Sequence, residues 1–196
     1  NVIAQGLGEA EGCLPETLRL IILGGERART EHLAEWLRCV PDGPRILNTY
    51  GPTEATVVAT STELTAADLQ DEELSIGKPI RNARAYVLDN RGQPVPAGVT
   101  GELHLAGAGL AEGYFEQPDL TAERFVPDPF ACEPGGRMYK SGDLARYRSD
   151  GNIEYVGRVD QQVKFRGYRI ELEEIESVLC REDAVQDAAV LLREDT

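Results

Sequence analysis

The stretch LRLIILGGE, residues 18–26, is an apolar run of strand length that ends in two glycines and a glutamate. Apolar residues between positions 33 and 40 then recur at the spacing of one helix face, and a second apolar run begins at Ile46. Strand, helix and strand in this order predict a right-handed parallel unit, and therefore an α/β region at the start of the chain.

The second apolar run leads directly into NTYGPTEAT, residues 48–56, which combines a stiff Gly-Pro corner with aromatic, hydroxyl and carboxylate side chains. Read alone, this stretch is equally well a tight polar connection. In parallel sheets, however, ligands bind beyond the carboxyl ends of the strands. The loops Gly24-Gly25-Glu26 and Thr49 to Glu54 would both lie there, which favours a binding site.

The composition indicates a globular protein, with 41% hydrophobic and 28% charged residues among 196. A formal net charge of −14 argues against nucleic acid and against an anionic membrane surface as partners, although a small anion needs only local donors. We find no apolar run of membrane-spanning length and no signal peptide. The chain begins and stops abruptly, so we expect it to be a piece of a longer protein.

The cysteines and histidines do not predict a metal site. Cys13, Cys39, Cys132 and Cys180 form no CxxC pair, and the two histidines, His32 and His104, lie far apart. Scattered thiols of this kind suit a reducing, cytoplasmic location. We interpret His32 as a helix-surface residue and His104 as a strand residue.

Beyond about residue 76 short apolar runs alternate with Gly and Pro turns, and the Asp150-Gly151 pair between two such runs predicts a β-hairpin. An acidic, solvated segment at 63–74 precedes this region. After Arg158 a strand at 162–167, a helix around 172–179 and a strand at 188–193 are expected. We therefore predict three parts: the end of an α/β subdomain (1–75), a distorted β-barrel or small antiparallel sheet (76–159) and the beginning of a small α+β lid (160–196).

Four motifs in order identify a resemblance that covers the chain from about residue 18 to its end. They are NTYGPTE (48–54), GELHLAGAGLAEGY (101–114), YKSGDLARY (139–147) and GRVDQQVKFRGYRIELEEIE (157–176). In this order they resemble adenylate-forming enzymes, and in detail the adenylation domain of a nonribosomal peptide synthetase. The expected fold is a truncated form of the adenylate-forming enzyme fold.

The resemblance implies a reaction. Such domains activate an amino acid with ATP as an aminoacyl adenylate, with Mg²⁺, and pass it to the phosphopantetheine thiol of a peptidyl carrier protein domain, beside neighbouring synthetase domains. An acyl- or aryl-CoA ligase is the near alternative, and a non-catalytic nucleotide-binding fragment is the alternative from another class.

By the same resemblance, Glu54 would bind Mg²⁺ and Thr53 would offer its hydroxyl to the α-phosphate; both are the catalytic candidates. Tyr50 and Tyr155 would cover the two faces of adenine. Asn48 would meet the adenine amino edge, or serve only as a structural strand residue.

The remaining nucleotide contacts are expected from Asp143 and Arg158. Asp143 would accept both ribose hydroxyls, with a turn aspartate as the alternative, and Arg158 would add a polar contact, with a surface charge as the alternative. The Gly24-Gly25-Glu26 loop would let the backbone approach the nucleotide. Ser141 and Glu112 stand where the family usually has Thr and Arg, so a contact made by that arginine is in doubt.

Asp160 is implied to be the hinge of the lid, and the basic loop 164–167 either swings toward the site or forms a solvated turn. The substrate side chain would be lined by five residues, which carry no charge and favour a neutral, mainly apolar amino acid: Ile22, Gly24, Thr49, Val57 and Val58.

Three parts of the family's machinery are not visible in the sequence: the loop that holds the pyrophosphate end of ATP, the aspartate for the substrate amine and the C-terminal lysine. The glycine-rich stretch 107–114 is not a substitute, because it lacks the Lys and Ser/Thr of a phosphate loop, and we interpret it as structural turns. The isolated chain is therefore expected to be inactive.

Overall fold

The computed structural model describes residues 14–132, 134–160, 162–165, 168–182 and 184–193. It begins with the predicted unit: strand β1 (Leu20–Leu23), helix α2 (Thr30–Cys39) and strand β2 (Arg45–Tyr50). β1 and β2 pair in parallel, from Leu20 opposite Arg45 to Leu23 opposite Asn48. The α/β prediction for this region is confirmed.

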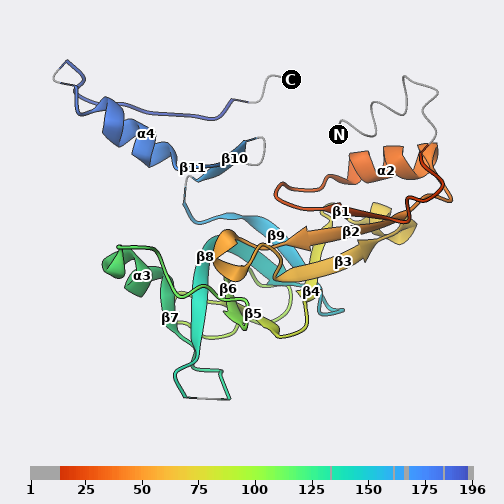
Figure 1. The fold of residues 1–196 in the computed structure, drawn as a ribbon, viewed down its shortest axis with the longest axis horizontal. Helices are drawn as coiled ribbons and strands as arrows, with labels where there is room; N and C mark the ends of the chain where they lie inside the picture. The colour runs from red at the N-terminus through yellow and green to blue at the C-terminus, as the bar shows by residue number, and fades with distance from the viewer. Residues whose placement is uncertain (1–13, 133, 161, 166–167, 183, 194–196) are drawn as a thin grey trace.

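Helix α2 covers one end of the sheet (Figure 1). Leu33 and Trp36 on one face of the helix are buried against Ile46, Leu64 and Leu74. This explains the period of the apolar residues in the sequence, because residues three and four apart share a helix face.

Nine of the described strands form one mixed sheet in the order β1-β2-β3-β4-β9-β8-β6-β5, with β7 paired to β8. The strands not yet introduced are β3 (Thr60–Leu64), β4 (Ser75–Pro79), β5 (Ala83–Leu88), β6 (Gly101–Gly107), β7 (Phe125–Pro127), β8 (Arg137–Tyr147) and β9 (Ile153–Arg158). Helix α3 (Pro118–Arg124) precedes β7. β8 and β9 form the hairpin predicted from Asp150-Gly151, with Arg148 N–H donating to the Asn152 carbonyl at 2.8 Å.

The distorted β-barrel expected for residues 76–159 is not closed: the described strands form an open sheet that ends at β5. The physical reason is the sharing of β4, which pairs with β3 on one side and with β9 on the other. The antiparallel strands therefore continue the first sheet instead of closing on themselves. Gly77 makes this junction possible, because its φ is +85° and a Cβ there would collide with the Ser61 carbonyl.

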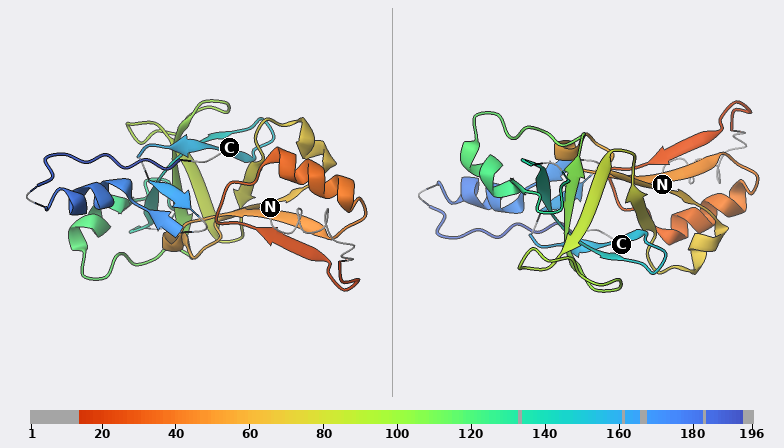
Figure 2. Two further views of the ribbon diagram at one scale, coloured as in Figure 1. Left: turned by 90° about the horizontal axis from the view of Figure 1, so that it is seen from above. Right: turned by 90° about the horizontal axis from the view of Figure 1, so that it is seen from below.

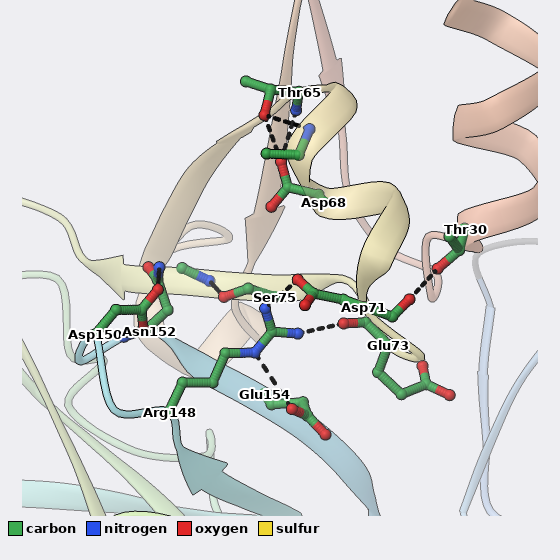
Figure 3. A network of polar contacts seen from close by, with 12 residues as sticks. Thr30, Thr65, Asp68, Asp71, Glu73, Ser75, Arg148, Asp150, Asn152 and Glu154 are labelled. Atoms are coloured by element: carbon green, nitrogen blue, oxygen red, sulfur yellow. Dashed lines mark hydrogen bonds and ion pairs between the residues drawn. The ribbon is translucent and has the colours of Figure 1, made fainter.

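The segment 63–74 is more than the solvated connection that its acidic composition suggested. It contains a short 3-10 helix (Ala66–Gln70), and Leu64 and Leu74 at its ends are buried. Arg148 on the hairpin holds it: its guanidinium lies 2.5 Å from Asp71 and 3.2 Å from Glu154, and also donates to the Glu73 carbonyl (Figure 3).

The last part contains the small hairpin β10 (Val163–Phe165) and β11 (Tyr168–Ile170), followed by helix α4 (Leu172–Leu179). Figures 1 and 2 show these elements over the end of the sheet that carries α3, opposite to α2. The strand expected at 188–193 is wrong, because no described strand lies alongside to pair with it. There, the Val190 N–H donates instead to the Glu176 carboxylate at 2.8 Å. None of the helices in the described ranges is long and apolar enough to cross a membrane.

Candidate functional site

The loops that follow β1 and β2 meet at one edge of the sheet. Thr49 Oγ1 donates to the Leu23 carbonyl at 2.7 Å, and a Cβ at Gly24 would lie only 2.6 Å from that hydroxyl. Any larger residue at position 24 would therefore press against Thr49. The carboxyl ends of β1 and β2 therefore lie side by side, as predicted, and Gly24 approaches Thr49 at the end of β2.

The turn after β2 is held in an unusual conformation. A Cβ at Gly51 would lie 2.7 Å from the Val57 carbonyl oxygen, so the chain folds back tightly here. A 3-10 turn at Thr53–Ala55 follows, and Thr56 and Val57 have φ of 57° and 68°, which β-branched residues rarely adopt. The Thr56 hydroxyl anchors the turn by donating to the Gly109 carbonyl at 2.6 Å. Backbone strain of this kind clusters at functional sites.

Glu54, in this turn, is buried and held by two tyrosines. Its Oε1 accepts hydrogen bonds from the Tyr114 hydroxyl at 2.7 Å and from the Tyr139 hydroxyl at 2.9 Å. Its main-chain carbonyl accepts from the Ala111 N–H at 2.8 Å. The glycine-rich segment 107–114 is thus a packing partner of the turn, in agreement with its interpretation as structural. Burial, followed by the hydrogen bonds to Tyr139 and Glu54, raises the pKa of Tyr114, so its hydroxyl remains a donor at neutral pH.

Asp143 lies at the centre of a second cluster. Its carboxylate accepts a short hydrogen bond from the Tyr50 hydroxyl and another from Arg158 Nη1 at 2.6 Å. Arg158 also donates from Nε and Nη2 to Asp160, at 2.6 and 2.8 Å. Burial lowers the pKa of Arg158, but the two carboxylates more than offset this and the net shift is upward. Asp143, with only 5% exposure, is therefore a buried strand residue that accepts two side-chain hydrogen bonds, and it does not lie in a turn.

Tyr50 and Tyr155 both flank this cluster. The Tyr50 ring is 9% exposed within the core, and burial followed by the charge of Asp143 raises the pKa of its hydroxyl well above the usual value. Tyr155 is half-buried on β9, and burial and then the Asp143 charge raise its pKa as well. Asn48 is buried and its amide donates to the Ser75 carbonyl at 2.7 Å, which is the structural role considered for it.

The residues expected to line the substrate pocket lie at the ends of β1 and β2 and just after the turn Thr53–Ala55. Ile22 and Val57 are 61% and 68% exposed, Thr49 and Val58 are partly exposed, and Gly24 and the adjoining Gly25-Glu26 face solvent. Thr53 is also exposed, in contrast to its neighbour Glu54. Of the basic loop, Arg166 and Gly167 lie outside the described residues.

Comparison with known proteins assigns the chain to a family. The family profile described as AMP-binding enzyme matches residues 2–115, more than half of the chain. The chain belongs to this AMP-binding enzyme family. Chondramide synthase cmdD of Chondromyces crocatus is 51% identical over 183 residues, covering 91% of this chain and 5% of that protein. The dimodular nonribosomal peptide synthase of Bacillus subtilis (strain 168) is 50% identical over 182 residues, covering 91% and 8% respectively.

Solved structures agree with this membership of the AMP-binding enzyme family. PA1221, described as an NRPS protein containing adenylation and PCP domains, superposes with a TM-score of 0.84 at 35% identity, over 92% of this chain and 36% of that one. The artificially fused adenylation-PCP di-domain NpsA-ThdA from Klebsiella oxytoca gives a TM-score of 0.75 at 33% identity, over 90% and 32%. The resemblance to nonribosomal peptide synthetase adenylation domains is confirmed, and the chain spans about a third of these solved relatives.

The donor set of this AMP-binding enzyme fits one mode of Mg²⁺ binding. Its described residues contain no group of three or more His, Cys, Asp or Glu side chains arranged for a metal ion. Mg²⁺ in nucleotide sites is commonly bound through one or two carboxylates together with substrate phosphates and water. Glu54, in the turn after β2, is the residue that would supply such a single carboxylate.

The sequence interpretation missed Tyr114 and Tyr139. Each lies in a motif that was singled out, Tyr114 at the end of the glycine-rich stretch and Tyr139 four residues before Asp143. The available signal was a tyrosine at one end of each motif. Nothing local indicated that both hydroxyls meet one carboxylate.

Proposed function

We propose that this chain is part of an adenylation domain that activates an amino acid with ATP and loads the aminoacyl group onto a carrier-protein phosphopantetheine thiol in nonribosomal peptide synthesis. One observation carries the proposal: Tyr50, which ends β2, donates to the buried Asp143 carboxylate and leads into the turn that holds the buried Glu54. Glu54 follows Tyr50 by four residues in the same turn.

The proposed nucleotide contacts follow from that arrangement. Asp143 accepts the ribose hydroxyls, because an ionised carboxylate has two acceptor oxygens, and Arg158 holds its charge in place. Tyr155 and Tyr50 border the adenine, with Asn48 behind them, and the Gly24-Gly25-Glu26 loop lies on the other side.

The proposed chemistry is attack of a substrate carboxylate oxygen on the α-phosphorus of ATP. The new acyl–phosphate bond forms as the bond to the β-phosphate breaks, and pyrophosphate leaves. Glu54 would hold Mg²⁺, which would supply positive charge that offsets the repulsion between the two anions. Thr53 donates its exposed hydroxyl to the α-phosphate, where negative charge develops. The strained turn 53–57 keeps both side chains oriented before the substrates arrive.

The amino-acid side chain is proposed to extend along Ile22, Gly24, Thr49, Val57 and Val58. These residues are uncharged, so a neutral and mainly apolar substrate is expected. Asp160 is proposed as the hinge of the 160–196 lid, and its double hydrogen bond with Arg158 connects the hinge to the ribose carboxylate.

The test is ATP–pyrophosphate exchange with the complete adenylation domain of the parent protein, supplied in turn with each common amino acid. Exchange that depends on one or a few neutral amino acids is expected. Thioester formation from amine-free carboxylic acids and coenzyme A, with no amino-acid-dependent exchange, would instead favour an acyl- or aryl-CoA ligase and overturn the proposal. The isolated 196-residue chain is expected to show no exchange, since it spans only 36% of a solved relative.

A further inference from the structure

Two tyrosine hydroxyls donate hydrogen bonds to the same carboxylate oxygen of Glu54, and the proposed reaction assigns neither tyrosine a role. Tyr114 and Tyr139 donate to Glu54 Oε1 at 2.7 and 2.9 Å, and their own hydroxyl oxygens are 3.4 Å apart. The three groups therefore form a compact triangle beside the turn that carries Thr53.

Packing holds both tyrosine rings in place. Tyr139 on β8 is 1% exposed, and its ring centroid lies 5.2 Å from that of Phe125. The Tyr114 ring lies 5.6 Å from the same Phe125 in an edge-to-face arrangement. Arg137 stands over the Phe125 ring at 5.7 Å and donates to the Glu112 carbonyl at 2.7 Å, which anchors the backbone just before Tyr114. Aromatic packing of this kind leaves the hydroxyls little freedom to move.

Neutral hydroxyl donors have a specific effect on a carboxylate. They stabilise its ionised form, and two donors on one oxygen also fix the side-chain torsions. Side chains that hydrogen-bond a metal ligand orient it, and their loss typically lowers metal affinity or activity about 10- to 100-fold. Glu54, the single carboxylate proposed for the cation, depends on such support more than a ligand in a cluster would.

We infer that Tyr114 and Tyr139 are positioning residues that hold the Glu54 carboxylate ready for a divalent cation bound with the nucleotide phosphates. This inference rests on the proposed function and deepens it. It also explains the role of the glycine-rich segment 107–114, which positions Tyr114 beside Glu54. This segment is hydrogen-bonded to the turn through the Ala111 N–H and the Gly109 carbonyl.

The experiment uses the complete adenylation domain with Tyr114→Phe and Tyr139→Phe, which remove only the hydroxyls. Mn²⁺ binding is measured by electron paramagnetic resonance in the presence of a non-hydrolysable ATP analogue, alongside the Mg²⁺ dependence of exchange. Each variant is expected to raise the half-saturating metal concentration about 10-fold, with little change in the KM of the amino acid. Tyr147→Phe is the matched control, because its hydroxyl donates at 2.7 Å to the Ala85 carbonyl and not to Glu54.

Unchanged metal half-saturation in folded Tyr114→Phe protein overturns the inference. Tyr114 is only partly buried, so this variant remains informative even if Tyr139→Phe does not fold. Glu54→Gln separates the two levels. If it weakens Mn²⁺ binding and the tyrosine variants do not, the positioning role alone fails; if the wild-type domain shows no amino-acid-dependent exchange, the proposed function fails.

Discussion

Replacement of Asp143 by Asn probes the nucleotide site most directly. Asn keeps the size of the side chain, and its amide oxygen can still accept from Arg158 Nη1, which lies 2.6 Å from the present carboxylate. The negative charge is lost, so each ribose hydroxyl would donate to a neutral acceptor or lose its acceptor altogether. A hydrogen bond to a charged group contributes about 1.5–3 kcal/mol.

That energy predicts a fall in kcat/KM for ATP of about 10- to 150-fold, since 1.4 kcal/mol corresponds to a factor of ten. The loss of stability should be smaller than the roughly 3–5 kcal/mol of a fully broken buried ion pair, because Arg158 retains Asp160. Thermal unfolding measures this second effect separately.

The assay is ATP–pyrophosphate exchange by the complete domain with ATP, 2′-deoxy-ATP and 3′-deoxy-ATP. The wild type should use both deoxy analogues less well than ATP, and Asp143→Asn should lose most of this preference. The reason is that the variant has already lost the Asp143 side of the interaction, so removing a ribose hydroxyl costs little more. Asp128→Asn is the matched control: Asp128 is also buried and paired with an arginine, Arg84, at 3.0 Å. If folded Asp143→Asn protein prefers ATP over the deoxy analogues by the wild-type factor, Asp143 does not bind the ribose.

Four further predictions concern the turn, the sheet and the hinge. Gly51→Ala should destabilise the chain by about 1–3 kcal/mol in urea unfolding, because its Cβ meets backbone at 2.7 Å, whereas Gly157→Ala, with open space, should cost less. Burial lowers the pKa of His104, so the unfolded state binds more protons and stability should fall as pH drops below about 6.5. Unfolding at pH 7.5 and 5.5 measures this slope, at most about 1.4 kcal/mol per pH unit, and His104→Gln should flatten it. Arg148→Met should lower the free energy of unfolding by about 1–3 kcal/mol, because Asp71 and Glu154 lose their ion pairs with the guanidinium. An unchanged urea midpoint would show that these ion pairs contribute nothing to stability. Asp160→Pro should spare exchange but slow transfer to the carrier thiol, unlike Asp160→Asn, which loses the charge without fixing φ; equal damage to both steps by both variants would argue against a hinge.

Local pattern was sufficient for much of the fold. Helical spacing predicted α2, and the Asp150-Gly151 pair predicted the hairpin of β8 and β9. Both features depend on contacts between residues close in sequence, and both predictions are confirmed. The strand at 188–193 shows the limit of this reasoning. Its composition suits a strand, but a strand exists only where a neighbour pairs with it, and pairing is a property of the tertiary structure.

The distorted β-barrel expected at 76–159 was only partly right for a similar reason, because its strands belong to an open sheet. Alternating short strands and turns predict antiparallel pairing but do not say which strand lies at the edge. β4 lies between β3 and β9, so the antiparallel strands continue the sheet that β1 and β2 begin. Only the three-dimensional arrangement decides this strand order.

The candidate site divides along the same line. The sequence by itself determined the family, the two loops at the strand ends and the presence of Glu54 and Asp143, because these residues stand in contiguous motifs. The tertiary structure alone decided their partners: Tyr50 meets Asp143 across 93 residues, and Tyr114 and Tyr139 meet Glu54 across 60 and 85. Hydrogen bonds between side chains so far apart leave no periodic trace in the sequence, since the sheet, and not the local chain, brings those atoms together.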